Sequence, residues 1–249
     1  MTAKRGTAMF LPAWNEADNL PIVVSEAVLY LHSRNEPFVV IIVDDGSTDN
    51  TAEVARMLEV TYPGHVRLVQ HRVNKGYGAA LRTGFKACLE SNFEWNGFCD
   101  ADGQFKPQDI GKLITSAVES DSDIAIGYRI ARADNFKRRM MGRAWHKLSR
   151  ALLGYKAIDV DCGFKVFRRH ALHSLNTQLA GNHATISPEI LARAFRAGLK
   201  VVEVGIDHFP RNHGTQSGSS LNVIWESVLG LVLVRQNINQ SAELKRKVS

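Results

Sequence analysis

Residues 38–49 read Phe38-Val39-Val40-Ile41-Ile42-Val43-Asp44-Asp45-Gly46-Ser47-Thr48-Asp49. The first half is a continuous apolar run rich in β-branched residues, which is typical of a parallel strand buried on both faces. The second half places carboxylates at the carboxyl end of that strand, where open α/β sheets bind ligands. Asp45 can accept hydrogen bonds from ribose hydroxyls or base N–H groups, whereas residues 47–49 can cap the helix that follows.

Similar apolar runs alternate with helical patterns along the first half of the chain. We expect strands at 8–11, 66–70, 93–99 and 123–126, and helices at 20–31, 51–58, 78–89 and 110–118. Pro107 suits a first helical position. This alternation predicts a doubly wound α/β fold, a mostly parallel sheet flanked by helices. We divide the chain into a domain at 1–218 and a C-terminal helix with a basic tail at 219–249.

Two further strands are followed by polar loops, and the second loop carries two carboxylates one residue apart. The loops are Pro12-Ala13-Trp14-Asn15-Glu16 and Asp100-Ala101-Asp102-Gly103-Gln104. In a parallel sheet all three loops share one edge. Residues i and i+2 of an extended chain point to the same side, so Asp100, Asp102 and Gln104 offer the oxygen ligands that Mg²⁺ or Mn²⁺ prefers. The alternative is a turn stabilised by its own side chains.

The composition limits the classes of binding partner but does not select one of them. The 249 residues carry a formal charge of +6, which favours an acidic partner such as nucleic acid, an anionic membrane or a phosphorylated substrate. Acidic strand ends would repel nucleic acid, so we expect none. Three widely spaced cysteines form no disulfide framework or zinc motif, which fits a reducing cytoplasm. We expect no signal peptide, and the apolar run at 228–234 is too short to span a bilayer.

The basic stretch 129–150 has two interpretations. Its Arg and Lys residues are interleaved with Met140, Met141, Trp145 and Leu148. It is either a solvated helix or an amphipathic segment at a membrane or at a phosphate-binding mouth. The apolar segment 221–238 near the end of the chain either packs on the core or lies at an interface.

The glycine-containing stretch Asn74-Lys75-Gly76-Tyr77-Gly78-Ala79 does not indicate a dinucleotide site. The third glycine of that motif would fall at Leu81, and the stretch follows the third strand instead of the first. A P-loop motif is also absent from the sequence. Both observations argue against an NAD enzyme and a P-loop nucleotidase.

Taken together, the motifs resemble family 2 inverting glycosyltransferases. The carriers of the resemblance are Pro12-x-Trp14-Asn15-Glu16, Asp44-Asp45-Gly46-Ser47-x-Asp49, Asn74-x-Gly76-x-Gly78-Ala79, Asp100-Ala101-Asp102-x-Gln104, Ile126-Gly127-Tyr128-Arg129 and Asp159-x-x-Cys162-Gly163-Phe164. The chain is most similar to polyprenyl- or dolichyl-phosphate mannose and glucose synthases. The resemblance implies a GT-A fold, a nucleotide-sugar donor, Mg²⁺ or Mn²⁺, a lipid-phosphate acceptor, and a cytoplasmic enzyme held peripherally at the membrane.

The same resemblance assigns roles to individual positions. The nucleotide-sugar residues would be Pro12, Trp14, Glu16, Val43, Asp45, Asp100, Ala101 and Asp102, and the metal ligands Asp102 and Gln104. The residues for donor or acceptor phosphate would be Arg129, one of Arg138 and Arg139, Arg211 and Ser217. The catalytic group would be Asp100, Arg129, Asp159 and Arg211. We expect Arg211 to lie at a distance from the residues that bind the nucleoside.

Two positions depart from the family pattern. Trp14 replaces the usual tyrosine, and the segment 211–218 lacks the usual lysine. The acceptor therefore stays open between a lipid phosphate and a soluble or secondary-metabolite hydroxyl. A phosphate monoester is ionised at neutral pH and requires no catalytic base. A hydroxyl acceptor would require one, and the candidates are Asp159 and Asp161, although Asp159 could instead only fix its loop.

Overall fold

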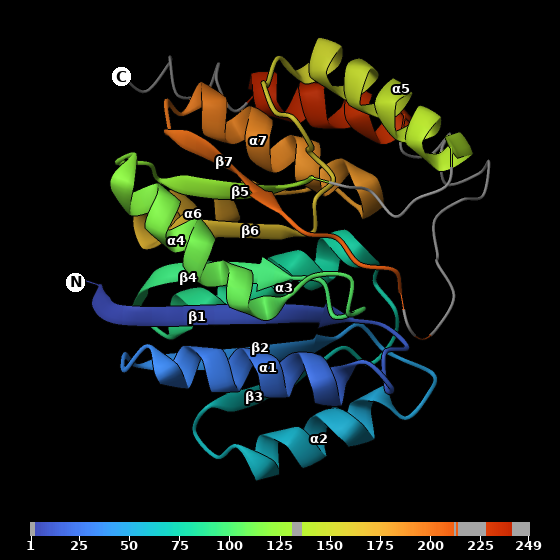
Figure 1. Cartoon of the computed structure of the whole chain (residues 1–249). Helices are drawn as coiled ribbons and strands as arrows, with labels where there is room; N and C mark the ends of the chain where they lie inside the picture. The colour runs from blue at the N-terminus through green and yellow to red at the C-terminus, as the bar shows by residue number, and fades with distance from the viewer. Residues whose placement is uncertain (1–2, 131–135, 212, 214–227, 241–249) are drawn as a thin grey trace.

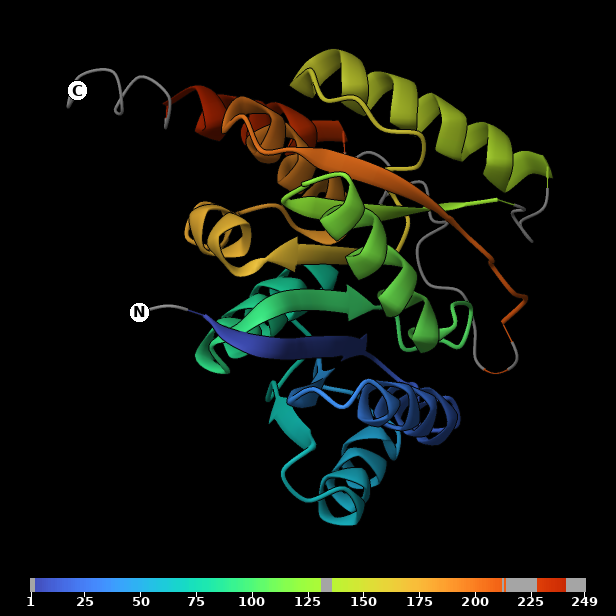
Figure 2. The ribbon, with the colours of Figure 1, turned by 60° about the vertical axis from the view of Figure 1, so that its left-hand side comes forward.

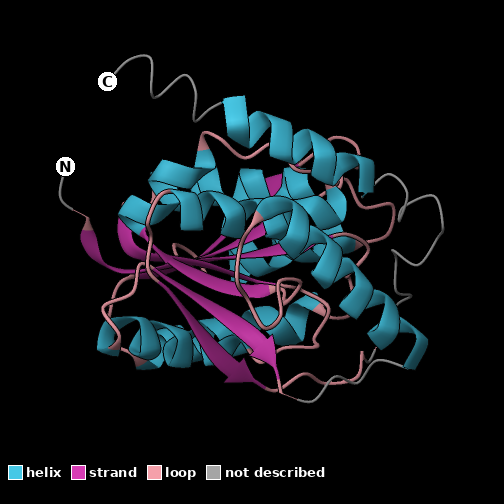
Figure 3. Ribbon diagram, turned by 90° about the horizontal axis from the view of Figure 1, so that it is seen from above, coloured by secondary structure: helices cyan, strands magenta, loops and turns pink. Residues whose placement is uncertain are grey.

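The computed structural model describes residues 3–130, 136–211, 213 and 228–240, and for 136–139 the backbone only. Within these residues a seven-stranded sheet has the order β3-β2-β1-β4-β6-β5-β7, with helices on both faces (Figures 1 and 3). The strands are β1(Lys4–Ala13), β2(Phe38–Asp44), β3(Val66–Gln70), β4(Phe93–Cys99), β5(Ile124–Arg129), β6(Phe164–Arg168) and β7(Val201–Ile206). The helices are α1(Leu20–Ser33), α2(Thr51–Thr61), α3(Tyr77–Glu90), α4(Ile110–Glu119), α5(Phe136–Leu153), α6(Arg169–Asn176) and α7(Ile186–Arg196), with 3₁₀ turns η1(Pro107–Asp109) and η2(His183–Thr185).

The first half of the fold confirms the predicted strands and their common edge. Strand β1 pairs in parallel with β2 on one side and with β4 on the other. The register places Pro12 beside Val43 and Phe10 beside Phe98. The loops after these three strands therefore meet at one edge of the sheet. Pro107 begins the 3₁₀ turn that leads into α4, one turn earlier than the predicted α-helix.

The core lies on both faces of the sheet because β1 alternates its side chains. Phe10 points to the face covered by α3, where its ring stacks on Phe98 at 5.4 Å and meets Phe85 edge-on at 5.2 Å. Met9 points to the other face, in the cluster formed with α1 and α4. A β-carbon at Gly84 would lie 2.2 Å from the Phe10 ring, so the close approach of α3 to β1 requires glycine there.

Two strands in the second half were not predicted from the sequence. Strand β6 lies antiparallel between β4 and β5, and β7 lies parallel to β5 at the edge of the sheet. Lys165 is fully buried in β6, where its Nζ donates to the carbonyls of Val160 at 3.1 Å and Cys162 at 2.6 Å. Because β6 runs backwards, the loop that precedes it, at residues 154–163, reaches the edge that carries the other polar loops.

Residues 136–150 of the basic stretch belong to helix α5, and a further helix occupies residues 228–240. Both lie near α7, away from β1–β3 (Figures 1 and 2). Leu231, Val234 and Ile238 are buried in the same core cluster as α7, so the described part of the predicted C-terminal helix packs on the main core. Residues 221–227 of that prediction lie outside the described residues.

Candidate functional site

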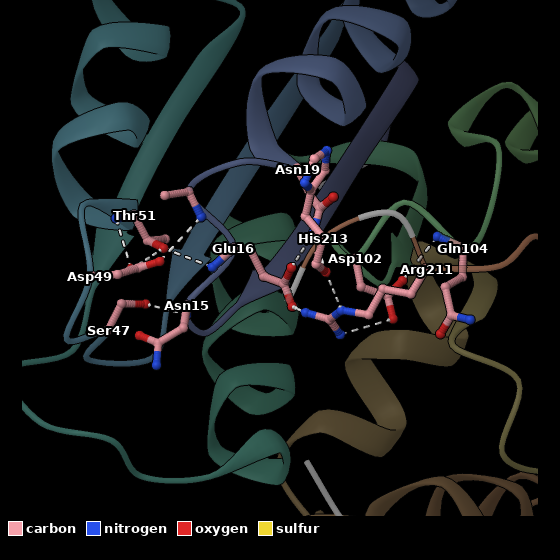
Figure 4. A network of polar contacts seen from close by, with 11 residues as sticks. Asn15, Glu16, Asn19, Ser47, Asp49, Thr51, Asp102, Gln104, Arg211 and His213 are labelled. Atoms are coloured by element: carbon pink, nitrogen blue, oxygen red, sulfur yellow. Dashed lines mark hydrogen bonds and ion pairs between the residues drawn. The ribbon is translucent and has the colours of Figure 1, made fainter. Parts of the chain in front are cut away.

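The loops after β1 and β2 are joined by hydrogen bonds at the carboxyl edge of the sheet (Figure 4). The Asn15 amide donates to Ser47 Oγ at 2.9 Å. Asn15 Oδ1 also accepts from the Thr48 amide at 2.9 Å. The Glu16 amide donates to Thr51 Oγ1 at 2.8 Å. Asn15 has φ of 57°, in the left-handed region that asparagine tolerates better than most residues. The loop that carries Glu16 is therefore held firmly against the loop after β2.

Arg211 joins two acidic loops of the site (Figure 4). Its Nη2 donates to Glu16 Oε1 at 2.5 Å, and its Nη1 lies 3.6 Å from Asp102 Oδ2. Its Nε donates to the carbonyl of His213 at 2.6 Å, and Asn19 Nδ2 donates to Glu16 Oε2 at 2.7 Å. Burial raises the pKa of Glu16, and the bonds from Asn19 and Arg211 oppose that shift. The expected separation between Arg211 and the nucleoside-binding residues is therefore wrong, because the segment after β7 folds back onto the start of α1.

Asp102 and Gln104 lie in the turn after β4, next to the segment that carries Arg211. Asp102 Oδ1 accepts from the Gln104 amide at 3.1 Å, so the turn is partly stabilised by its own side chain. Gln104 Nε2 donates to the carbonyl of Phe209 at 3.1 Å, and the Phe209 amide donates to the carbonyl of Gln104 at 2.9 Å. The structure thus shows a self-stabilised turn at this loop, and the assignment of Asp102 and Gln104 to a metal stays a prediction.

A divalent cation fits this pair of oxygen donors. The structure already places one cation, the Arg211 guanidinium, against Asp102 Oδ2. Mg²⁺ uses one or two protein carboxylates together with water and substrate phosphates. The described residues contain no group of three His, Cys, Asp or Glu side chains able to hold a metal. A site built from Asp102 and the Gln104 amide would therefore depend on the substrate to complete its coordination.

Asp100 takes different partners from Asp102, so the two carboxylates do not act as one chelating pair in this structure. Tyr77 donates its hydroxyl to Asp100 Oδ1 at 2.8 Å, and the Asp100 amide donates to the carbonyl of Gly163 at 3.0 Å. Burial and then the charge of Asp102 raise the pKa of Asp100 to about 7. A cation bound at Asp102 would lower that pKa again by offsetting the neighbouring charge.

Asp45 uses both carboxylate oxygens inside the protein. Its Oδ1 lies 2.6 Å from His71 Nδ1 and accepts from the Lys75 amide at 3.0 Å, and its Oδ2 accepts from the Gly76 amide at 2.8 Å. The side chain is buried. Asp45 therefore anchors the loop that leads into α3, and its assignment to the nucleoside stays a prediction.

The remaining predicted nucleotide-binding residues differ in exposure. Pro12 and Val43 are buried where β1 and β2 pair, so their side chains serve the core. Ala101 is buried between the two aspartates of its loop. Trp14 is 40% exposed, which leaves its ring accessible at the edge of the sheet. Of these four residues, Trp14 has the side chain best placed to contact a ligand.

Arg129 and Asp159 form a bidentate ion pair between the end of β5 and the loop before β6. Arg129 Nε donates to Asp159 Oδ2 at 2.6 Å and Nη2 donates to Oδ1 at 2.8 Å, with both side chains largely buried. Loss of one partner of such a pair costs about 3–5 kcal/mol. Asp161 lies nearby and accepts from Trp145 Nε1 at 3.2 Å, and burial raises its pKa. The geometry favours the loop-fixing interpretation of Asp159.

Three predicted phosphate-binding side chains cannot be placed. The side chains of Arg138 and Arg139, in the first turn of α5, and the whole of Ser217 lie outside the described residues. Their assignments remain predictions.

The structure adds four residues to the site that sequence reasoning did not assign. His71 supports Asp45, Tyr77 and Gly163 contact Asp100, and Lys165 holds the loop before β6. The position of His71 just after β3 was a usable signal, because this strand ends at the same edge. Tyr77 and Gly163 lay within quoted motifs but had no assigned role, and Lys165 gave no sequence signal.

Comparison with known proteins identifies the fold. Solved structures of glucosyl-3-phosphoglycerate synthase from Mycobacterium tuberculosis superpose with a TM-score of 0.68 for the complex with Mn²⁺, UDP and glucosyl-3-phosphoglycerate. The sequence identity is 20%, and the match covers 93% of this chain and 80% of that protein. The protein described here has the GT-A fold, as the sequence predicted.

Sequence comparison identifies the family. Polyprenol monophosphomannose synthase from Mycolicibacterium smegmatis is 30% identical over 224 residues, 87% of this chain and 82% of that protein. A dolichyl-phosphate beta-glucosyltransferase from Trichomonas vaginalis is 33% identical over 216 residues, 80% of this chain and 64% of the relative. The model of glycosyl transferase family 2 matches residues 9–175. This chain is therefore an enzyme, a glycosyltransferase that belongs to family 2.

Proposed function

We propose that this enzyme transfers a sugar, with inversion, from a UDP- or GDP-linked donor to a polyprenyl or dolichyl phosphate, assisted by a divalent metal. The contact of Arg211 with both Glu16 and Asp102 carries the proposal, because it joins three residues assigned to phosphate, nucleoside and metal. The names of the relatives support the acceptor, since they include a polyprenol-phosphate and a dolichyl-phosphate sugar transferase.

The residues around Asp102 would each contact a different part of the donor. A bound Mg²⁺ or Mn²⁺ at Asp102 and Gln104 would offset the charge that develops on the leaving diphosphate. Arg211, once released from the carboxylates, would donate to phosphate oxygens through its fixed fork of N–H groups. Trp14 would provide an aromatic wall beside the nucleoside.

The contacts of Asp159 favour a phosphate acceptor over a hydroxyl acceptor. Asp159 uses both carboxylate oxygens to hold Arg129, which suits the alignment of a guanidinium toward a phosphate better than the removal of a proton. The second pKa of a phosphate monoester is about 6, so the acceptor is largely ionised at pH 7 without a base. If the acceptor were a hydroxyl, Asp161 would be the better base, because burial raises its pKa.

A donor and acceptor screen tests this proposal. UDP- and GDP-sugars are offered with polyprenyl phosphate, and with the dephosphorylated polyprenol as the matched control, in Mn²⁺ and in EDTA. We expect transfer to the phosphate, none to the polyprenol, and loss of transfer in EDTA. Transfer to polyprenol or to a soluble alcohol would replace the lipid phosphate with a hydroxyl acceptor.

A lipid acceptor also requires access to a membrane surface. The described helices contain none that is long and apolar enough to cross a bilayer. Apolar side chains are instead exposed on α5 and on the helix at 228–240. They are Met140, Met141, Leu148, Leu229, Val232 and Leu233. Together with the basic residues of α5 they supply the two signals that reversible interfacial binding needs.

Sedimentation with liposomes tests the membrane surface. We expect binding to anionic vesicles at low salt, and we expect Met141→Asp to weaken it, because a carboxylate on α5 opposes both signals. Leu29→Asp on α1 is the matched control, since Leu29 is 69% exposed on a different helix. Equal sedimentation with neutral and anionic vesicles, or equal loss in both variants, would exclude this surface.

A further inference from the structure

The glycine-containing loop at 74–78 has no role in the proposed function, although it packs closely against the segment before η2. Gly76 has φ of 86°, in the left-handed region that favours glycine. A β-carbon at Gly78 would lie 2.3 Å from the carbonyl oxygen of Gly181, so a larger residue could not pack there. The loop is therefore held in one conformation between the start of α3 and the segment before η2.

This loop contacts two carboxylates that come from different strands. The amides of Lys75 and Gly76 donate to Asp45, which follows β2. The hydroxyl of the next residue, Tyr77, donates to Asp100, which follows β4. Consecutive residues of one loop thus connect the nucleoside side of the predicted donor site to the sugar side.

Asp100 is confined from two directions. Tyr77 donates to Oδ1 at 2.8 Å, and the other oxygen lies against the bare α-carbon of Gly163, where a β-carbon would be 1.9 Å from Oδ2. Among the described residues, the Tyr77 hydroxyl is the only group that donates a hydrogen bond to this carboxylate. A partly buried carboxylate beside a second one, Asp102, is costly unless it is well paired. Such a local conflict is expected at a functional site.

We propose that Tyr77 is a positioning residue that fixes the Asp100 carboxylate toward the sugar of the donor. The inference rests on the proposed function, which places Asp100 in the donor site. Tyr77 acts through Asp100, whereas the neighbouring backbone amides act through Asp45. Removing the hydroxyl should therefore affect recognition of the sugar and leave recognition of the nucleoside diphosphate intact.

The variant Tyr77→Phe removes only the hydroxyl. Calorimetry without acceptor measures the affinity for the nucleoside diphosphate alone and for the corresponding nucleotide sugar. We expect the diphosphate affinity to stay within about twofold, and kcat/KM for the nucleotide sugar to fall about 10- to 100-fold, the usual size for one hydrogen bond to a charged group. The added affinity that the sugar contributes should fall in parallel.

Two further variants separate positioning from folding. Tyr155→Phe removes another buried tyrosine hydroxyl, which lies 2.6 Å from Ser149 Oγ, and should leave both affinities unchanged. Gly163→Ala places a methyl group against the other oxygen of Asp100 and should reproduce the sugar-specific loss more strongly. The melting temperature of each variant shows whether it is folded.

The outcomes are distinguishable from those of the proposed function. Equal kcat/KM in Tyr77→Phe and the unaltered enzyme would overturn the inference. Equal losses of diphosphate and nucleotide-sugar affinity would also overturn it, since Tyr77 would then only shape the loop that binds Asp45. If Tyr77→Phe loses the affinity that the sugar adds while the unaltered enzyme transfers nothing to polyprenyl phosphate, Tyr77 is supported and the proposed acceptor is wrong. Failure of the unaltered enzyme to bind any nucleotide sugar would overturn both.

Discussion

Asp102→Asn should abolish most transfer, with a fall in turnover of about 10²–10³-fold. The amide keeps the shape of the side chain but removes the charge that would hold the metal, and a bound metal contributes several kcal/mol to the reaction. The other carboxylate in contact with Arg211, Glu16, is bonded to Asn19 as well and belongs to a different loop, so it is poorly placed to replace Asp102. Initial rates and Mn²⁺ binding by electron paramagnetic resonance measure the two effects together.

A remote carboxylate provides the control. Asp121→Asn alters an exposed residue paired with Lys200, before β5 and away from the site, and should leave rate and metal binding unchanged. Full activity of Asp102→Asn, or full activity of the unaltered enzyme in EDTA, would contradict a metal-assisted mechanism.

Arg211→Lys should lower turnover at saturating donor by about 10²-fold, the cost of losing one preorganised donor to developing charge. Lysine keeps the charge but cannot contact two groups through a planar fork. Because Arg211 touches Glu16, we also expect a smaller fall in affinity for the nucleoside diphosphate. Kinetics and calorimetry on the same preparation compare the two losses.

Removal of the Arg211 guanidinium should strengthen metal binding in the absence of nucleotide, although it weakens turnover. Arg211→Met removes the guanidinium that neutralises Asp102, so Mn²⁺ should bind about fivefold more tightly, the value of a modest ion pair. Arg5→Lys, at the exposed pair with Glu36, is the control and should change neither quantity. Unchanged turnover in Arg211→Lys together with unchanged Mn²⁺ affinity in Arg211→Met would show that the observed contacts have no functional role.

The parallel half of the fold was predictable because its sequence signals are local. The run at 38–43 is apolar enough for a strand buried on both faces, and the polar residues directly after it belong at a ligand-binding edge. The same reasoning located the loops with Glu16 and Asp102. What it predicted was the shared edge, and the register of β1 with β2 and β4 confirms that edge.

The remaining features depend on partners distant in the sequence. Lys165 interrupts the apolar pattern of β6, and its burial is possible only because two carbonyls of the preceding loop accept from its ammonium group. Arg211 meets Glu16 across 195 positions of the chain. Asp45 was assigned to a ligand from its position after β2, and that position does not reveal its partners, His71 and two amides, which follow a different strand. The spacing of residues along the sequence does not indicate such contacts.

The reversed direction of β6 has a consequence for reading related sequences. In a fully parallel sheet, residues that face the ligand follow their strands, so a search downstream of each apolar run finds them. Here one group of residues at the ligand-binding edge expected from the sequence, which includes Asp159 and Gly163, precedes its strand. Searches that look only downstream will overlook that group in every homologue with this topology. Exchanging the loop that carries Asp159 and Gly163 between such homologues would alter one side of the candidate site while keeping the three loops after β1, β2 and β4.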